Sequence, residues 1–147
     1  MTLVDYFTIS VSQQPAQDIL VLMSDATHDE PHLSQSHGTG VMNALVPLAR
    51  DLRHQIPEVM KAFGDLHGAV MKPGALDSKT KELIALAIAV SDRCDGCISS
   101  HARGAAKQNA TEAEVAEAIG VAVLMTGGPA TVYGPRALAA FKEYASS

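Results

Sequence analysis

The chain has 147 residues, a formal net charge of −5, two cysteines, only 4% aromatic residues and no tryptophan. One domain is expected at this length, and it is large enough to fold without a structural metal or disulfide. The acidic balance and the scattered basic residues argue against nucleic acids and anionic membrane surfaces as partners. No apolar run reaches the roughly 18 residues of a membrane span. The first residues, MTLVDYFTIS, lack the basic region of a secretion signal, so a cytoplasmic location is expected.

Residues 1–40 are expected to form an N-terminal arm ahead of an all-helical domain at 41–147. Segment 24–40 (SDATHDEPHLSQSHGTG) is polar and holds three histidines, which favours a loop or flexible arm over a metal site. The short apolar run before it, 19–23, fits either a strand or a helical turn.

Helical patterns follow one another in the domain. Residues 41–54 are amphipathic but contain Pro47, so they form either one kinked helix or two short ones. Pro57 suits the first position of a helix that runs to about Met71. Asp77 or Ser78 can cap the next helix.

That next helix is apolar on nearly all sides over 82–90, which predicts a central, buried position. Cys94 then opens a helical segment that runs to about Gln108, and Asn109 suits a left-handed cap at its end.

The clearest helix start is the capping box of Thr111 and Glu114. Pro129 fits the start of a last helix, which Gly134-Pro135 is expected to interrupt before it ends at Tyr144. Five or six helices with short connections predict an all-α bundle. The apolar segments 82–90 and 115–125 exceed what one small bundle covers, so a homo-oligomer is expected.

The two cysteines form the motif Cys94-Asp95-Gly96-Cys97 at a helix start. Three interpretations are open: a redox pair, two inert thiols, or half of a zinc site completed by His101 and Glu82. One helical turn lets a disulfide close, and a helix N-terminus lowers the pKa of a nearby thiol, so both features favour the redox pair.

His101 follows Cys97 by four residues, so the two side chains share a helix face and the imidazole can exchange a proton with the thiol. Glu82 lies about 15 Å along its helix from the turn near Asp92, at 1.5 Å per residue. If the next helix folds back antiparallel, His101 lies roughly 10 Å along it on the other side. The two side chains could then meet and relay protons.

Glu82, Cys94, Cys97 and His101 reproduce the E-x11-C-x2-C-x3-H spacing of the AhpD-like proteins in the carboxymuconolactone decarboxylase superfamily. The segments KELIALAIAVSDRCDGCISSHARGAAKQNATEAEVAEAI and GGPATVYGPRALAAFKEY also resemble that family, and the resemblance covers about residues 45–145. It implies an all-α fold, a homo-trimer or homo-hexamer, and reduction of alkyl hydroperoxides without a bound cofactor.

The same resemblance implies that Cys97 attacks the peroxide and that His101 and Glu82 activate the Cys97 thiol. It also implies that Cys94 closes the disulfide. Electrons would come from a dithiol or a protein thiol. One departure is that well-studied peroxidase members have a second histidine at the position of Gly96. Two alternatives are a lyase of the carboxymuconolactone decarboxylase type, which would have no use for the cysteine pair, and a non-enzymatic redox-sensing oligomer.

Overall fold

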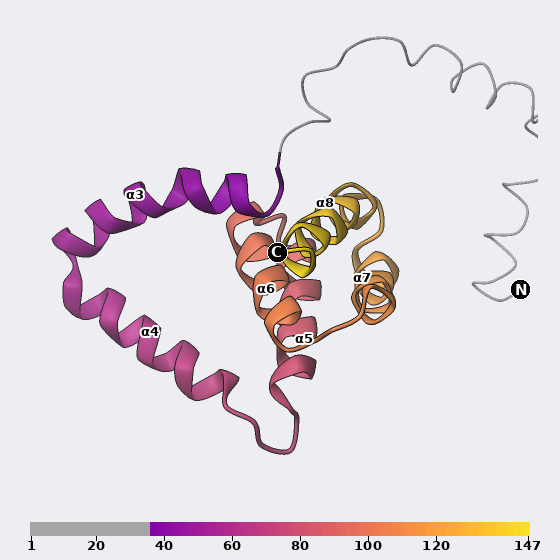
Figure 1. Ribbon diagram of the computed structural model, residues 1–147, viewed down its shortest axis with the longest axis horizontal. Coiled ribbons are helices and arrows are strands. Elements are labelled where there is room, and N and C mark those ends of the chain that lie inside the picture. Colours follow the sequence, from indigo (N-terminus) through magenta and orange to yellow (C-terminus); the bar gives the residue numbers. More distant parts are fainter. Residues whose placement is uncertain (1–35) are drawn as a thin grey trace, which may run out of the picture. The chain divides into compact units, whose positions relative to one another are not determined.

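The computed structural model describes residues 36–147, which form six α-helices and no strand within that range (Figure 1). The helices are α3 (Thr39–Gln55), α4 (Pro57–Met71), α5 (Ser78–Ser91), α6 (Asp95–Lys107), α7 (Glu112–Thr126) and α8 (Gly128–Ala145). The prediction of an all-α fold is confirmed. None of these six helices has the length and apolarity needed to cross a membrane. The apolar run 19–23 and most of the polar segment 24–40 lie outside the described residues.

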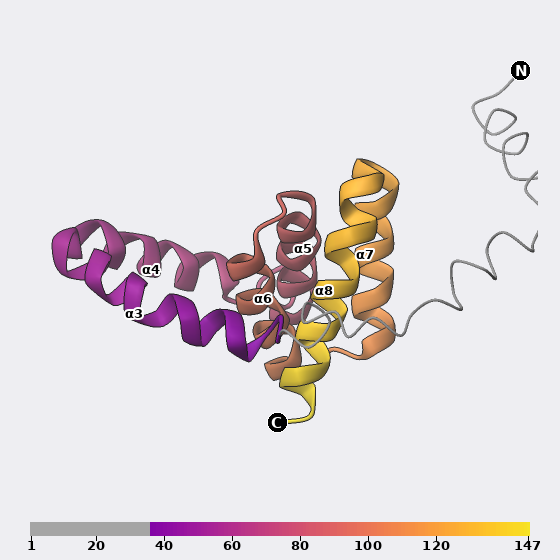
Figure 2. The same cartoon turned by 90° about the horizontal axis from the view of Figure 1, so that it is seen from above.

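Helices α5 to α8 pack against one another. Helices α3 and α4 form a hairpin whose connection lies far from these four helices, because α3 leaves the bundle and α4 returns to it (Figures 1 and 2). Within residues 36–147, the buried hydrophobic core comes only from the four packed helices. Its members are Leu86, Ala89, Val90, Ile98, Ala102, Ala105, Val115, Ile119, Ala122, Ala130, Ala137, Ala140 and Phe141. More than half of them are alanine, so the helix backbones approach closely and few large side chains fill the space between them.

The helix ends follow local chemistry that the sequence displays. Asp77 Oδ1 accepts a hydrogen bond of 2.7 Å from the Thr80 backbone N–H and caps α5. Thr111 and Glu114 form the predicted capping box at the start of α7. Asn109 has φ 57°, which confirms the left-handed position expected after α6.

The prolines inside helices do not end them. Residues around Pro47 form one helix, α3, and the interruption predicted at Gly134-Pro135 is wrong because α8 continues through it. Gly134 is buried, and a Cβ there would lie 2.6 Å from Ile119 Cγ2. The missing side chain therefore lets α8 lie directly on α7, and this packing offsets the backbone hydrogen bond lost at Pro135.

Helix α5 is central to the bundle but only one side of it is buried. Leu86 and Val90 are fully buried, whereas Ile84 is 46% and Ile88 55% exposed. The predicted central position of this helix is confirmed, whereas its predicted burial holds for one side only. The exposed side of α5 adjoins an apolar hollow shared with Val121 of α7.

Helix α3 is anchored to the bundle by a carboxylate from α8. Glu143 accepts hydrogen bonds from Ser36 Oγ at 2.6 Å and from the backbone N–H groups of His37, Gly38 and Thr39 at 3.0–3.3 Å. Partial burial raises the pKa of Glu143, but the hydrogen bonds from Ser36, Thr39 and Gly38 outweigh it and lower the pKa from 4.5 to about 2. The Glu143 carboxylate therefore caps the N-terminus of α3, although it is distant from that helix in sequence.

Replacing Glu143 with glutamine is expected to lower the free energy of unfolding at pH 7 by about 1 kcal/mol, the usual effect of losing a helix cap. Because the folded-state pKa is depressed, the carboxylate's contribution is complete above pH 4.5 and is lost as the pH falls toward 2. Urea titrations at pH 7 and pH 3 should show the deficit of the variant shrinking at the lower pH. Glu117→Gln, on an exposed part of α7, is the matched control. A deficit that is equal at both pH values would contradict this role.

Candidate active site

A tight turn between α5 and α6 brings the cysteine motif to the end of the bundle. Helix α5 ends at Ser91 and α6 begins at Asp95. Arg93 adopts the left-handed conformation, with φ 57°, and Cys94 N donates to Ala89 O at 3.1 Å. Cys94 therefore occupies the N-cap position of α6, as expected for a motif that opens a helix.

The two cysteines are joined by a disulfide across the first turn of α6. Their Cα atoms lie 5.2 Å apart, within the range that a disulfide requires. Cys94 Sγ also accepts a hydrogen bond of 3.3 Å from the Cys97 backbone N–H. Cys97 is the more exposed of the two residues. The more exposed cysteine is thus the one nearer to His101 in sequence.

Glu82 and His101 meet across the α5–α6 hairpin, as the helix geometry predicted. His101 Nδ1 lies 2.8 Å from Glu82 Oε2. Glu82 is 9% exposed and is the one charged residue among the buried side chains of the described range. A carboxylate at Nδ1 fixes the tautomer in which Nδ1 carries the proton, and this leaves Nε2 able to accept one.

The approach of Glu82 to α6 depends on a glycine that the sequence reasoning did not single out. A Cβ at Gly104 would clash with the Glu82 carboxylate. Gly104 stands inside a helix, where glycine is unfavourable by about 1 kcal/mol relative to alanine. A glycine three residues after the motif histidine was the signal available in the sequence.

A second histidine, also not assigned a role from sequence, lies beside the pair. The ring of His67, from α4, stacks on that of His101 with 6.1 Å between ring centroids and 30° between planes. The α3–α4 hairpin therefore reaches the bundle at His101. Nothing in the pattern of α4 pointed to this contact, because it depends on how the hairpin folds back.

Arg136 of α8 is the third residue that sequence reasoning missed. Its guanidinium pairs with Asp95 of the cysteine motif at 3.5 Å and lies 4.7 Å above the centre of the Tyr133 ring. The negative charge beside the disulfide is thereby compensated. Tyr133 supports the arginine that faces the motif.

Gly96, which departs from the pattern of the family that the sequence resembles, lies next to α3. A Cβ at Gly96 would lie 2.8 Å from Leu45 Cδ1. Glycine here allows α3 to approach the turn between the two sulfurs, and a larger residue would displace Leu45. The departure from the family pattern is thus coupled to the position of α3.

The zinc alternative lacks its ligands in this arrangement. Both sulfurs are bonded to each other, and no group of three histidine, cysteine or acidic side chains in residues 36–147 is arranged to hold a metal ion. The four sequence-predicted site residues nonetheless lie on one hairpin, as a disulfide at its turn and an acid–imidazole pair further along it.

The sequence model of the carboxymuconolactone decarboxylase family matches residues 57–143, the greater part of the chain and all four of these residues. The chain belongs to the carboxymuconolactone decarboxylase family. The resemblance seen in the sequence is thereby confirmed.

Two relatives are similar to more than half of the chain. An uncharacterized protein of Cupriavidus necator is 39% identical over 85 residues, which are 58% of this chain and 75% of that protein. An uncharacterized protein of Paracoccus denitrificans from the cox locus is 43% identical over 82 residues, 56% of this chain and 74% of that one.

Two crystal structures of family members share the fold. One, from Legionella pneumophila, is 43% identical and superposes with a TM-score of 0.69 over 71% of this chain and 94% of its own. Another, from Thermotoga maritima, is 32% identical with a TM-score of 0.59 over 68% of this chain and 88% of its own, and is described with a suggested part in the antioxidative response.

Proposed function

We propose that the protein is a thiol-dependent peroxidase that reduces alkyl hydroperoxides through Cys94 and Cys97 in the cytoplasm. The observation that carries the proposal is the Cys94–Cys97 disulfide at the start of the helix that presents His101 to the buried Glu82. Two-electron reduction of a peroxide requires a thiol pair that can be oxidised to a disulfide and a group that transfers protons, and this hairpin carries both.

In the first step, the Cys97 thiolate attacks the terminal peroxide oxygen and the O–O bond breaks. Cys97 becomes a sulfenic acid, and the peroxide leaves as an alkoxide that takes a proton to become an alcohol. His101 accepts the thiol proton at Nε2 and delivers it to the alkoxide. Glu82 holds the imidazole in the required tautomer and stabilises its cationic form.

In the second step, the Cys94 sulfur attacks the sulfenic sulfur and the S–O bond breaks. The sulfenic hydroxyl leaves and takes the Cys94 thiol proton to become water. This forms the Cys94–Cys97 disulfide, which is the state described here. A dithiol donor, either a small molecule or a protein, then reduces the disulfide by exchange and is itself oxidised to a disulfide. The cycle needs no bound cofactor.

The two other activities considered from sequence have less support. A decarboxylating lyase uses acid–base groups and would have no use for a disulfide at its site. A redox sensor needs the disulfide but not repeated turnover, so turnover separates it from a peroxidase.

The test is consumption of tert-butyl hydroperoxide with dithiothreitol or dihydrolipoamide as donor. We expect many peroxides reduced per chain, in proportion to protein concentration. Consumption that stops after one peroxide per chain would assign the protein to the sensors. No consumption at all, in the presence of a disulfide that forms and can be reduced, would contradict the peroxidase.

We also propose that the protein works as a homo-oligomer, a trimer or hexamer. The α3–α4 hairpin carries large apolar side chains but has no buried residue. Exposed members on it are Leu48, Leu52, Ile56, Val59, Phe63, Leu66 and Val70. A second apolar surface on α5 and α7 includes Ile84, Ile88, Val121, Leu124 and Met125. Apolar surface on this scale is typical of subunit interfaces.

Light scattering after size exclusion should therefore give a mass of three or six chains at micromolar concentration. Phe63→Glu, which puts a charge into the middle of the exposed face of α4, is expected to shift the mass toward the monomer. The matched control is Lys61→Glu, on the same helix but in a surface ion pair with Asp65. A wild-type protein that remains monomeric would refute this assembly.

A further inference from the structure

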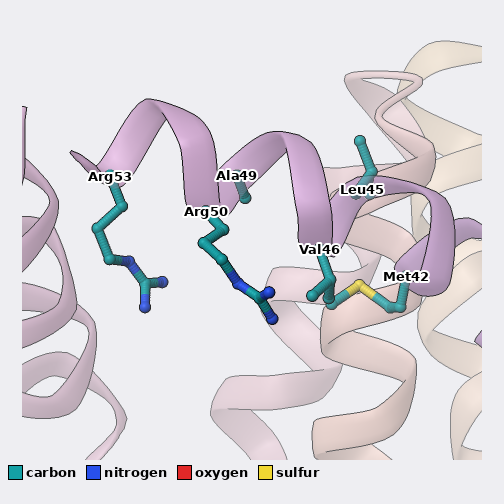
Figure 3. A pocket seen from close by; sticks show the side chains of 7 residues that line it. Met42, Leu45, Val46, Ala49, Arg50 and Arg53 are labelled. Carbon is teal, nitrogen blue, oxygen red and sulfur yellow. The ribbon is translucent and has the colours of Figure 1, made fainter. Parts of the chain in front are cut away.

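Helix α3 forms one wall of a groove that ends at the cysteine motif. The groove has a volume of about 450 Å³ and is lined by Met42, Leu45, Val46, Ala49, Arg50, Arg53 and Gly96 (Figure 3). The six residues from α3 recur at the spacing of one helix face. Gly96 is the contribution of α6, and it lies between the two cysteines in sequence.

The two ends of the groove differ in chemistry. At the end near Gly96 the lining is apolar, from Met42, Leu45 and Val46. At the far end, the side chains of Arg50 and Arg53 extend next to each other from α3 (Figure 3). The distance from Leu45 to Arg53 along the helix is about 12 Å, at 1.5 Å per residue.

The two guanidinium groups have no carboxylate partner within residues 36–147. Neither takes part in a salt bridge, and the lining of the groove contains no acidic residue. The chain as a whole has a net charge of −5. The two neighbouring arginines without acidic partners therefore make this end of the groove positively charged, opposite in sign to the chain as a whole. Arginine pairs bind carboxylates through short, charge-assisted hydrogen bonds.

We propose that this groove binds an alkyl hydroperoxide that carries a carboxylate at the far end of its chain, such as the hydroperoxide of a fatty acid. The carboxylate pairs with Arg50 and Arg53, the hydrocarbon chain lies along Ala49, Val46 and Leu45, and the peroxide group reaches the cysteine turn at Gly96. The proposal rests on the proposed peroxidase function for the identity of the reacting group. The binding of a carboxylate-ended chain does not depend on it.

Calorimetric titration of the full-length protein with linoleic acid and with its methyl ester, below their aggregation limits, tests the binding. We expect the acid to bind at least about tenfold more tightly than the ester, and Arg50→Gln/Arg53→Gln to remove this preference. Arg103→Gln, at an exposed position of α6, is the control and should keep it. Equal affinity for acid and ester in the wild type would overturn the proposal. The proposal would also be overturned if the acid did not bind and the double variant had a changed oligomer mass. A second copy of the chain would then fill the groove.

Turnover of linoleic acid hydroperoxide and of its methyl ester completes the test. The ratio of their kcat/KM values should favour the acid about tenfold in wild type and in Arg103→Gln, and should approach one in the double arginine variant. A ratio that the double variant leaves unchanged would overturn the proposal. If tert-butyl hydroperoxide is not reduced either, the peroxidase function fails. The binding preference for the acid over the ester still tests, by itself, whether the groove binds a carboxylate-ended chain.

Discussion

Replacing Cys97 with serine is expected to abolish peroxide turnover, with a loss of at least about 10³-fold in kcat/KM, because serine cannot form the sulfenic intermediate. Cys94→Ser should behave differently. Without a thiol donor, prereduced Cys94→Ser should consume about one peroxide per chain and then stop at the Cys97 sulfenic acid, because the chain has no second thiol to close the disulfide. The burst of tert-butyl hydroperoxide consumption is measured on prereduced protein with no donor present, because excess dithiol would itself reduce the sulfenic acid. The steady phase of the wild type and of Cys97→Ser is then measured with dihydrolipoamide.

Cys97→Ser and Cys94→Ser should differ in peroxide consumption but not in fold or assembly. Circular dichroism and the oligomer mass should match the wild type in both, because neither cysteine belongs to the buried core. A Cys97→Ser protein that still turns over would show that Cys97 is not the attacking residue. A full burst in Cys97→Ser with none in Cys94→Ser would exchange the roles of the two thiols.

Glu82→Gln is expected to slow peroxide reduction by about 10²-fold if proton transfer limits the rate. Glutamine keeps the size of the side chain and a hydrogen bond to His101 Nδ1, but it loses the charge that stabilises the imidazolium. His101→Gln should have a similar effect, and the double variant should cost less than the product of the two, because both residues serve one relay. The pH midpoint of Cys97 alkylation by iodoacetamide in the reduced protein should rise in each variant.

Glu117→Gln, an isosteric change at an exposed carboxylate of α7, is the control for the charge removed at Glu82. It should leave both the rate and the alkylation midpoint at their wild-type values. Wild-type turnover and alkylation in both Glu82→Gln and His101→Gln would exclude the relay. The cysteines would then act alone or depend on a partner protein for activation.

The parts of the fold that sequence predicted are those with local causes. The helix at Pro57–Met71, the cap at Asp77 and the capping box of Thr111 each depend on residues within one or two turns. The meeting of Glu82 and His101 was predictable as well, because a short turn and the fixed rise of a helix determine which residues face each other across a hairpin.

The features that sequence missed depend on contacts between distant segments. Glu143 anchors residues that precede it by more than 100 positions, and Arg136 reaches Asp95 from another helix. Stacking of His67 on His101 requires the α3–α4 hairpin to fold back onto the bundle. The helix interruption predicted at Gly134-Pro135 was wrong because a glycine beside a proline usually ends a helix. Here the glycine instead allows α8 to pack on α7.

The central claim is that Cys94 and Cys97 cycle between dithiol and disulfide within one chain. Reduced protein should be mixed with one equivalent of tert-butyl hydroperoxide, and its free thiols counted by alkylation and intact mass. The account predicts the loss of two thiols per chain, a mass lower by two hydrogen atoms, no covalent dimer, and recovery of both thiols with dihydrolipoamide. Two thiols that remain free, or a disulfide that joins two chains, would contradict it.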